Sequence, residues 1–567
     1  MTGRQKLVVI GNGMVPGRVL ETLFETAPDL YDVTIFNAEP RVNYNRIMLS
    51  PVLSGESTYE DIIIHDEAWY ETNNVTLHMG AKVTGIDRDA KRVTSENGIN
   101  ETYDKLLIAT GSSPFIIPVP GHDLPGVLAY RDLDDVNKML EVSKKKGSKA
   151  VVIGGGLLGL EAAAGLQMQG MNVTVLHLMP TLMERQLDES AGYLLEKELT
   201  ARGINVLTKA NTKEILGADK VEGVRLEDGT ELAADMVIMA VGIRPNLMLA
   251  KEAGLDTGRG ITVGGTLQTS DPNIYAVGEC VEFDGQCYGL VAPLYEQARI
   301  CAGVLAGAPE ETYCHSETST KLKVTGVDLF SAGDFADGDT REEIVFRDAP
   351  RGVYKRLVLE DGLLVGAVLY GDTADGAWFF QKIKDKEPIT DDERETLIFG
   401  QSYAGGTPLD PMAAVAALPD EAEICGCNGV STGKICKAID SEALTSLDGV
   451  RACTKASSSC GTCTGLVESL LAFKLGDAFE ANTKKTVCEC TDLGHDDVRR
   501  LIVSQNLKSI PAVIQELGWK TSCGCAKCRP ALNYYLVASW PGEYIDDGRS
   551  RFINERVHAN IQKDGTY

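Results

Sequence analysis

Two stretches of the chain repeat one order of apolar and polar positions. The first reads KLVVIGNGMVPG, a β-branched apolar run that ends in glycines, and it continues as RVLETLFETA, whose apolar residues have helical spacing. The second reads KAVVIGGGLLGLEAAAGLQMQG and is followed by another apolar run, MNVTVLHL. Each order predicts a strand, a tight glycine turn and a helix whose amino-terminal end faces a pyrophosphate group.

In the first turn, Gly11 and Gly13 stand where the turn and the close approach of a phosphate require glycine. Pro16 occupies the third glycine place and Gly17 follows it, and proline is tolerated in a first helical turn because its missing N–H is not needed there. We expect this departure to affect helix-to-strand packing more than phosphate binding. Glu39 follows the second predicted strand, YDVTIF, and is suited to accept hydrogen bonds from ribose hydroxyls. Taken alone, this loop favours a plain glycine turn.

The second turn is a complete G-x-G-x-x-G, formed by Gly154, Gly156 and Gly159, and it predicts a dinucleotide site. The acid expected at the end of the following strand is missing, because His177 stands near its place. The choice between NADH and NADPH is therefore open. Since no arginine directly follows that strand to hold a 2′-phosphate, the pattern favours NADH.

Three more apolar strands end in loops near the borders of these segments, in LLIATGSSP, MVIMAVGIRPN and TSDPNIYAVGEC. Two nested nucleotide domains of this kind are what hydride transfer from a nicotinamide to a flavin requires. The residues at the three strand ends are Ala109, Thr110 and Gly111, then Ala240 to Asn246, and finally Gly278 and Glu279.

Farther along the chain, residues 320–372 alternate in strand fashion between Gly and Asp turns, which predicts a small sheet. The stretch FGQSYAGGTPLDPMAAVAALPDEAE is rich in Gly, Pro and Ala and predicts a linker.

The chain has 15 cysteines, and 11 of them lie beyond residue 424. Eight form two quartets of the same design, C-x-C, a gap of 32 or 34 residues, then C-x-x-C. Both gaps predict two short helices around a turn, with Ile435, Ile439, Leu444 and Val450 in the first small core and Val498, Ile502, Ile510 and Leu517 in the second. Four thiolates can hold zinc or an iron–sulfur cluster, and spacing alone leaves both open. The quartets are Cys425, Cys427, Cys460 and Cys463, and Cys488, Cys490, Cys525 and Cys528.

The 567 residues carry a formal charge of −26, which argues against nucleic acid or an anionic membrane as a partner. No window of about 18 consecutive apolar residues occurs, so we expect no membrane span. The opening MTGRQ runs straight into an apolar strand, unlike a signal peptide, and we expect a cytoplasmic protein. In that compartment, clustered cysteines indicate metal or redox chemistry more often than disulfides.

The two nucleotide loops and the strand ends resemble the pyridine nucleotide-disulfide oxidoreductase superfamily, in the branch of rubredoxin and ferredoxin reductases. The resemblance implies FAD at the first loop, NAD(P)H at the second, and a flavin ribityl contact at Gly278 and Glu279, where glutamate replaces the family's aspartate. It also implies that Arg46, in VNYNRIMLSP, contacts FAD. No cysteine precedes Cys280, so the redox cysteine pair of the disulfide reductases is missing and electrons need another exit.

The quartets resemble the bacterioferritin-associated ferredoxin (BFD)-like 2Fe-2S domain. This resemblance implies one or two 2Fe-2S clusters that accept single electrons from the flavin. In the second quartet, the neighbouring Cys523 is a competing ligand for Cys525, and structural zinc stays open there.

The whole order of segments, with HDDVRRLI and CRPALNYYL, is similar to the large subunits of assimilatory NADH-dependent nitrite reductases. In that family a sirohaem and 4Fe-4S domain follows, whose ligands come as C-x5-C and C-x3-C, and neither spacing occurs here. We therefore expect a truncated chain that collects electrons from NADH and reaches nitrite only through the missing domain. The closing RFINERVHANIQKDGTY looks like the first strand of that domain's ferredoxin-like part.

The predicted fold class is α/β, with two nested Rossmann-like FAD and NAD(P)-binding domains, a small α+β domain, and two small helical cysteine-rich domains. The expected boundaries are 1–120 with 246–312 for FAD, 121–245 for NAD(P)H, 313–400 for the small sheet, 401–420 for the linker, 421–482 and 483–540 for the BFD-like domains, and 541–567 for the start of the nitrite reductase domain.

Two alternatives remain beside the electron-input half of a nitrite reductase. One is the electron-transfer subunit of an assimilatory nitrate reductase, which passes electrons to a separate molybdenum protein. The other is a flavoprotein scaffold with zinc-held interaction modules. A small subunit or acceptor protein is a candidate partner, and a homodimer is what the family suggests. No catalytic acid or base is identified, because catalysis here is mainly the positioning of nicotinamide against flavin.

Overall fold

The computed structural model describes residues 4–550, except for 310, 316–318, 325–326, 401–402, 405–406, 409–414, 416–417, 460, 462, 477–486, 489, 492, 522–523, 526–527 and 548–549. It divides into two compact units, Met1–Ala443 with Val450–Phe473, and Leu444–Gly449 with Lys474–Tyr567. Most of the predicted linker and the predicted strand at 551–567 lie outside the described residues.

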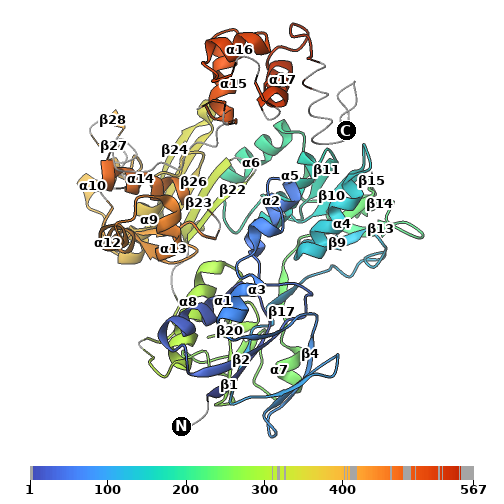
Figure 1. Cartoon of the computed structure of the whole chain (residues 1–567), viewed down its shortest axis with the longest axis vertical. Helices are drawn as coiled ribbons and strands as arrows, with labels where there is room; N and C mark the ends of the chain where they lie inside the picture. Colours follow the sequence, from blue (N-terminus) through green and yellow to red (C-terminus); the bar gives the residue numbers. More distant parts are fainter. Residues whose placement is uncertain are drawn as a thin grey trace. The chain divides into compact units, whose positions relative to one another are not determined.

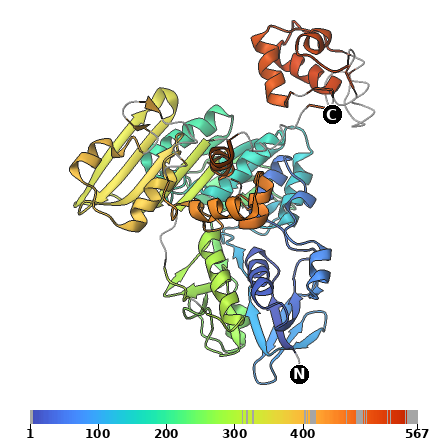
Figure 2. The ribbon, with the colours of Figure 1, turned by 60° about the vertical axis from the view of Figure 1, so that its left-hand side comes forward.

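The amino-terminal domain is built on a parallel sheet in the order β19-β7-β1-β2-β3. Helices α1 (Met14–Thr26) and α8 (Val291–Leu305) lie side by side against it, although nearly the whole nucleotide region separates them in sequence (Figures 1 and 2). The strands are β1 (Gln5–Ile10), β2 (Tyr31–Phe36), β3 (Thr76–His78), β7 (Lys105–Ile108) and β19 (Ile274–Ala276).

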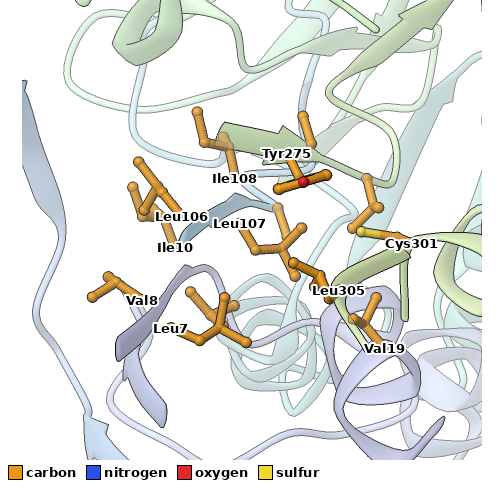
Figure 3. Packing of buried hydrophobic residues seen from close by; sticks show 14 of the residues in the cluster. Leu7, Val8, Ile10, Val19, Leu106, Leu107, Ile108, Tyr275, Cys301 and Leu305 are labelled. Atoms are coloured by element: carbon orange, nitrogen blue, oxygen red, sulfur yellow. The ribbon is translucent and has the colours of Figure 1, made fainter. Parts of the chain in front are cut away.

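Apolar side chains from distant parts of the chain fill the space between this sheet and its helices. Leu7, Leu106 and Leu107 of the central strands are fully buried, and Cys301 of α8 is buried among them (Figure 3). Because both surfaces of a parallel sheet are covered, its strands are continuous apolar runs. This explains why the β-branched runs were visible in the sequence.

A second parallel sheet, in the order β12-β11-β10-β16-β9, lies within the chain segment between β7 and β19. Two of the loops predicted at the segment borders pair with each other, since β8 (Ser112–Pro114) and β17 (Ile243–Pro245) form an antiparallel ladder. Helix α5 (Leu157–Met168) follows β10. The strands of the sheet are β9 (Val127–Ala129), β10 (Lys149–Ile153), β11 (Asn172–Leu176), β12 (Asn205–Leu207) and β16 (Met236–Met239).

Short elements complete these two domains. The small antiparallel sheets are β4 (Val83–Asp87) with β5 (Arg92–Ser95) and β6 (Asn100–Thr102), and β13 (Thr212–Leu216) with β14 (Gly223–Leu226) and β15 (Glu231–Ala233). A mixed sheet joins β18 (Ile261–Thr262), β20 (Val281–Phe283) and β21 (Gln286–Cys287). The helices are η1 (Arg46–Met48), α2 (Leu49–Ser54), η2 (Glu60–Ile62), α3 (Glu67–Thr72), α4 (Leu133–Ser143), α6 (Glu189–Ala201) and α7 (Met248–Glu252).

The alternating stretch 320–372 forms an antiparallel sheet in the order β22-β23-β26-β25-β24, drawn in yellow and yellow-green in Figure 1. Helix α9 (Gly376–Asp385) packs on β26 and β23, and α10 (Asp391–Leu397) follows. The strands are β22 (Ser319–Val324), β23 (Val327–Gly333), β24 (Arg341–Asp348), β25 (Val353–Glu360) and β26 (Leu363–Tyr370), and η3 (Ala349–Arg351) joins β24 to β25. The predicted small sheet is confirmed.

The first cysteine segment begins after a short β27–β28 pair (Tyr403–Ala404, Thr407–Pro408). The stretch between its two cysteine pairs forms the two predicted helices, in which Ile435, Ile439 and Val450 are buried. Leu444 is half-buried in the turn between these helices, and Leu447 is buried at the start of the second helix. The elements are β29 (Glu423–Cys425), β30 (Val430–Ser431), α12 (Thr432–Glu442), α13 (Leu447–Thr454) and α14 (Thr464–Leu475).

The second cysteine segment contains α15 (His495–Ser504), α16 (Ile510–Glu516) and α17 (Cys528–Ser539). Val498, Ile502 and Ile510 are buried in its core as predicted, and Leu517 packs on the edge of that core, half-buried. The predicted α/β fold class with helical cysteine-rich segments is confirmed. Among the described helices, none combines the length and apolarity that a bilayer crossing needs.

Candidate cofactor cavity and cysteine centres

Both glycine loops begin with a residue that no other amino acid can replace without strain. Gly11, directly after β1, has φ +108°, and an added Cβ would lie 2.2 Å from the carbonyl oxygen of Ala109. Gly154, directly after β10, has φ +121°, and its Cβ would lie 2.2 Å from the carbonyl oxygen of Ala240. A positive φ of this size favours glycine. The two loops therefore share one geometry at the carboxyl ends of their sheets.

The next glycines leave room for a ligand. Gly13 and Gly156 are the N-cap residues of α1 and α5, and an added Cβ at either would meet no atom within 4 Å. Free backbone N–H groups and the helix dipole make such helix ends favourable for phosphate. At Gly159 the requirement is internal, because its Cβ would lie 1.9 Å from the carbonyl oxygen of Gly154.

The departure at Pro16 does not loosen the first helix. Pro16 and Gly17 are both buried in the first turns of α1, and a Cβ on Gly17 would come within 2.6 Å of the Asn43 side-chain nitrogen. Gly17 thus allows the close packing that was expected to suffer from the missing third glycine.

A cavity of about 1030 Å³ opens beside the first loop. This volume is at the upper end of the range of about 300–1,000 Å³ for ligand pockets. The first turn of α5 reaches the cavity through Leu157 and Leu158, while the glycines of the second loop are not among its lining residues. Cys427 of the first quartet and the neighbouring Gly426 also line the cavity. The predicted residues that line it are Gly11, Gly13, Glu39, Arg46, Ala109, Thr110, Gly111, Gly278 and Glu279.

Both predicted carboxylates of the cavity are paired with arginines. Glu39 forms an ion pair with Arg46, and its second oxygen accepts a hydrogen bond from the Tyr44 hydroxyl at 2.9 Å. Glu279 forms an ion pair with Arg131 and accepts a hydrogen bond from Ser112 Oγ at 2.9 Å. The sequence prediction missed Arg131, which follows β9 and carries no motif. Each ion pair holds its arginine and its carboxylate in a fixed position on the cavity wall.

A third carboxyl group in the cavity, Glu161 of α5, was also missed. Its Oε2 accepts a hydrogen bond from Ser50 Oγ at 2.7 Å, and Ser50 Oγ lies 2.9 Å from the Tyr130 hydroxyl. Burial raises the pKa of Glu161 above its ordinary value, although the Ser50 hydrogen bond opposes the shift. The available sequence signal was a single acid within the apolar helical run LLGLEAAAGL.

His177 stands at the end of β11, where an acid was expected. Its Nδ1 accepts a hydrogen bond from the backbone N–H of Gly155 at 3.1 Å, and its Nε2 lies 2.9 Å from the carbonyl oxygen of Thr181. The imidazole is buried, and its hydrogen bond to Gly155 supports the second glycine loop.

In the first quartet, the sulfurs of Cys425 and Cys427 lie 3.7 Å apart. Hydrogen bonds from Cys427 and Cys463 lower the pKa of the Cys425 thiol far below its ordinary value, so the structure brings these three cysteines together. Cys460 lies outside the described residues. The amide of Asn428 also donates to both sulfurs, at 3.5 Å to Cys425 and 3.4 Å to Cys427. The lowered pKa of Cys425 favours the thiolate, which is the form that binds a metal.

In the second quartet, the sulfurs of all four predicted cysteines lie within 4.8 Å of one another. The sulfurs of Cys525 and Cys528 lie 3.6 Å apart, and Cys523 lies outside the described residues. Burial raises the pKa values of Cys488 and Cys528, so both stay thiols until a metal displaces their protons. The donor set fits an iron–sulfur cluster or zinc.

Removing the metal from the second quartet is expected to unfold its helical segment. Cys488 and Cys528 are part of the same hydrophobic core as Val498 and Ile502. A core of this size supplies at most about 3–5 kcal/mol, while structural metals contribute about 10–16 kcal/mol in zinc-finger peptides. We expect Cys528→Ala to abolish slow amide exchange in α15 to α17. Cys453→Ala, at an exposed cysteine of α13, is the control and should leave that exchange unchanged. Wild-type protection in Cys528→Ala would show that the core needs no metal.

Comparison with known proteins gives three family matches along this chain. Residues 5–302 match the pyridine nucleotide-disulphide oxidoreductases, residues 319–387 match the rubredoxin NAD+ reductase C-terminal domain, and residues 423–472 and 486–538 each match the BFD-like 2Fe-2S binding domain. The last match covers both quartets and supports the duplication.

Two relatives from Bacillus subtilis (strain 168) are similar over nearly the whole chain. One is an NAD(P)H nitrite reductase, 48% identical over 100% of this chain and 70% of its own length. The other is an assimilatory nitrate reductase electron transfer subunit, 39% identical over 95% of this chain and 69% of its own length. Among solved structures, the covalent putidaredoxin reductase–putidaredoxin complex has a TM-score of 0.63 and 26% identity, covering 74% of this chain and 100% of that one. The chain therefore belongs to the pyridine nucleotide-disulphide oxidoreductase family, as an FAD-dependent NAD(P)H oxidoreductase with 2Fe-2S domains, in the group that includes the NAD(P)H nitrite reductases.

Proposed function

We propose that this chain takes electrons from NADH at the cavity beside the first loop and delivers them one at a time through the first cysteine quartet. The observation that carries the proposal is the shared lining of that cavity. Gly11 and Gly278 lie on its wall together with Gly426 and Cys427, so the proposed flavin site and the first cysteine centre face the same space. A flavin bound there would have its outlet next to it.

We assign FAD to this cavity through the predicted residues. Gly11, Gly13 and the amino-terminal end of α1 would hold the pyrophosphate, since the helix end offers free N–H groups. Glu39 would accept ribose hydroxyls, and Gly278 and Glu279 would contact the ribityl chain. Ala109, Thr110 and Gly111, which lie next to the first loop, also line the cavity, and Arg46 supplies a positive charge. The pKa of Arg46 is raised by Tyr44 and Glu39 although burial opposes this shift, so its charge is secure.

We assign the nicotinamide nucleotide to the second loop. Gly154, Gly156 and Gly159 shape that loop, and α5 carries Leu157 and Leu158 from the loop into the flavin cavity. A nucleotide bound at the start of α5 would therefore have its ring directed to the same cavity. His177, hydrogen-bonded to the loop, leaves the site without the fixed 2′-phosphate arginine that NADPH selection uses, and we propose NADH as donor.

When bound, FAD accepts a hydride from NADH and can release the two electrons singly to 2Fe-2S clusters. The chain's contribution is to bind, orient and enclose. The cavity walls are largely apolar side chains and glycine backbone, which exclude water from the reacting rings. The eight predicted cysteine ligands would hold two clusters.

We propose nitrite as the final acceptor, because one of the two similar Bacillus relatives is an NAD(P)H nitrite reductase. Nitrite would be reached through sirohaem and 4Fe-4S groups, whose C-x5-C and C-x3-C ligand spacings do not occur among the 15 cysteines of this sequence. The nitrate reductase electron transfer subunit supports a second acceptor, a separate reductase protein. We also propose that the protein is cytoplasmic, that it forms a homodimer and that it has a small subunit as a partner. The domain boundaries are those given in the sequence analysis.

The test combines metal analysis with anaerobic reduction. Iron, acid-labile sulfide and zinc are measured per FAD, and two Cys-ligated clusters predict about four irons and four sulfides. NADH should then bleach the flavin absorption and produce the electron paramagnetic resonance signal of reduced 2Fe-2S clusters, with rapid reduction of ferricyanide and no loss of nitrite. About two irons with zinc would make the second quartet structural. Zinc without sulfide would contradict the proposal and favour the scaffold alternative.

A further inference from the structure

The residue that follows the first C-x-C pair links the cysteine centre to the flavoprotein domain. The Asn428 amide nitrogen donates to the sulfurs of Cys425 and Cys427, at 3.5 and 3.4 Å, and to Ser459 Oγ at 3.1 Å. Its carbonyl oxygen accepts a hydrogen bond from Arg18 Nη2 at 2.8 Å. A guanidinium has donors and no acceptor, so the atom facing Arg18 must be the oxygen. Arg18 thereby fixes the amide nitrogen toward the sulfurs.

Arg18 is itself held firmly on α1. Its Nη1 lies 3.3 Å from Glu21 Oε2, and its guanidinium carbon lies 4.6 Å from the ring centroid of Tyr295 on α8. Glu21 Oε1 in turn lies 2.9 Å from His65 Nε2. Although burial would raise the pKa of Glu21, the His65 hydrogen bond and the Arg18 charge lower it, so the carboxylate stays ionised. The arginine that orients Asn428 thus has little freedom to turn away.

Two further contacts hold the same surface together. Lys455 Nζ lies 3.8 Å from Glu21 Oε1, and the buried Asn45 amide donates to the carbonyl oxygen of Ser459 at 2.9 Å. Asn45 directly precedes Arg46 of the flavin cavity, and Ser459 directly precedes Cys460. Both halves of the quartet are therefore connected to the flavoprotein domain by hydrogen bonds or ion pairs.

We propose that Asn428 and Arg18 are positioning residues that set the reduction potential of the first centre when it is docked beside the flavin. N–H donors to cluster sulfurs stabilise the more negative, reduced cluster and so raise its potential. Because Arg18 belongs to the flavoprotein domain, the donor is aimed only while the two surfaces are in contact. The first centre is thereby the better electron acceptor in its docked position.

The second quartet offers a natural comparison. Thr491 follows Cys490 at the place that Asn428 occupies after Cys427. Its hydroxyl accepts the backbone N–H of Leu493 at 3.2 Å, within its own loop. The two repeats thus differ at the residue that couples the first one to the flavoprotein domain.

The inference rests on the proposed function, and the test separates the two. In the full chain, the midpoint potential of the first centre is measured by anaerobic redox titration with electron paramagnetic resonance detection. Asn428→Leu, which keeps the side-chain size without a donor, is expected to lower the electron-transfer equilibrium constant at least tenfold, or about 59 mV for one electron. Arg18→Met should shift the potential in the same direction by a smaller amount. Flavin reduction by NADH should change less than twofold in both, since neither side chain lines the cavity.

Thr491→Val is the matched control and should leave the first-centre potential unchanged. Iron and sulfide are counted in each variant, and Arg18→Met, outside the cysteine segment, decides the matter if Asn428→Leu loads poorly. An unchanged potential in Arg18→Met and Asn428→Leu, in protein whose clusters still accept electrons from NADH, would overturn this inference alone. A wild-type chain with zinc in the first quartet would overturn both this inference and the proposed function.

Discussion

Gly11→Ala is expected to yield protein with less than a tenth of the wild-type FAD content and a correspondingly small NADH–ferricyanide activity. The residue has φ +108°, and the new Cβ would lie 2.2 Å from the carbonyl oxygen of Ala109, a backbone atom that cannot rotate away. Relieving this overlap must move the β1 loop or the Ala109 loop, and both line the proposed flavin site. Flavin absorbance per protein after gel filtration measures the loss.

Two variants separate backbone strain from general damage. Gly85→Ala, in strand β4 of the same domain, adds its Cβ where nothing lies within 4 Å and should keep full FAD content. Gly13→Ala also adds its Cβ in open space, but at the N-cap that faces the proposed pyrophosphate, so it should fold normally and bind FAD more weakly. Full flavin content in Gly11→Ala would contradict the assignment of the first loop to FAD.

The elements that the sequence predicted well are those whose signal is local. The glycine loops were found because a turn with positive φ between a buried strand and a helix permits few residues, and Gly11 and Gly154 have this conformation. The parallel sheets were found because strands covered on both surfaces are continuous apolar runs. The quartets were visible because the short spacings C-x-C and C-x-x-C occur twice, and the structure brings the sulfurs of Cys488, Cys490, Cys525 and Cys528 within 4.8 Å of one another.

The parts that the sequence did not reveal depend on contacts between distant residues. Arg131 pairs with Glu279 across 148 positions, and its side chain has no motif to mark it. Asn428 was overlooked because its importance depends on Arg18, which lies on a helix of another domain. The apolarity of Leu444 and Leu447 does not show which of them is more buried, and the turn between α12 and α13 leaves Leu444 half-buried and Leu447 buried.

Both repeats carry a quartet, and the first has a proposed ligand, Cys427, on the wall of the proposed flavin cavity. A flavin must pass its electrons over a short path, so the centre that shares its cavity is the natural first acceptor. The remaining centre would then receive electrons from the first one. This order of transfer is a proposal that can be measured.

Cys427→Ala is expected to stop electrons at the flavin. The variant removes a proposed ligand of the first centre at the cavity wall, while the residues proposed to hold FAD and NADH are unchanged. Flavin reduction by NADH should therefore keep its wild-type rate within about twofold. The NADH-dependent cluster signal should fall more than a hundredfold, because any cluster left in the second quartet has lost its supply. Dithionite, a small reductant that needs no flavin, should still reduce that remaining cluster.

Cys528→Ala is the matched variant in the second repeat and should leave reduction of the first centre by NADH intact. The two outcomes together fix the order of transfer, from the flavin to Cys425, Cys427, Cys460 and Cys463 and then onward. If Cys427→Ala still passed NADH electrons to the second centre at the wild-type rate, the flavin would have a second outlet. The cavity wall formed by Cys427 and Gly426 would then be a structural contact, and the argument from shared lining would fail.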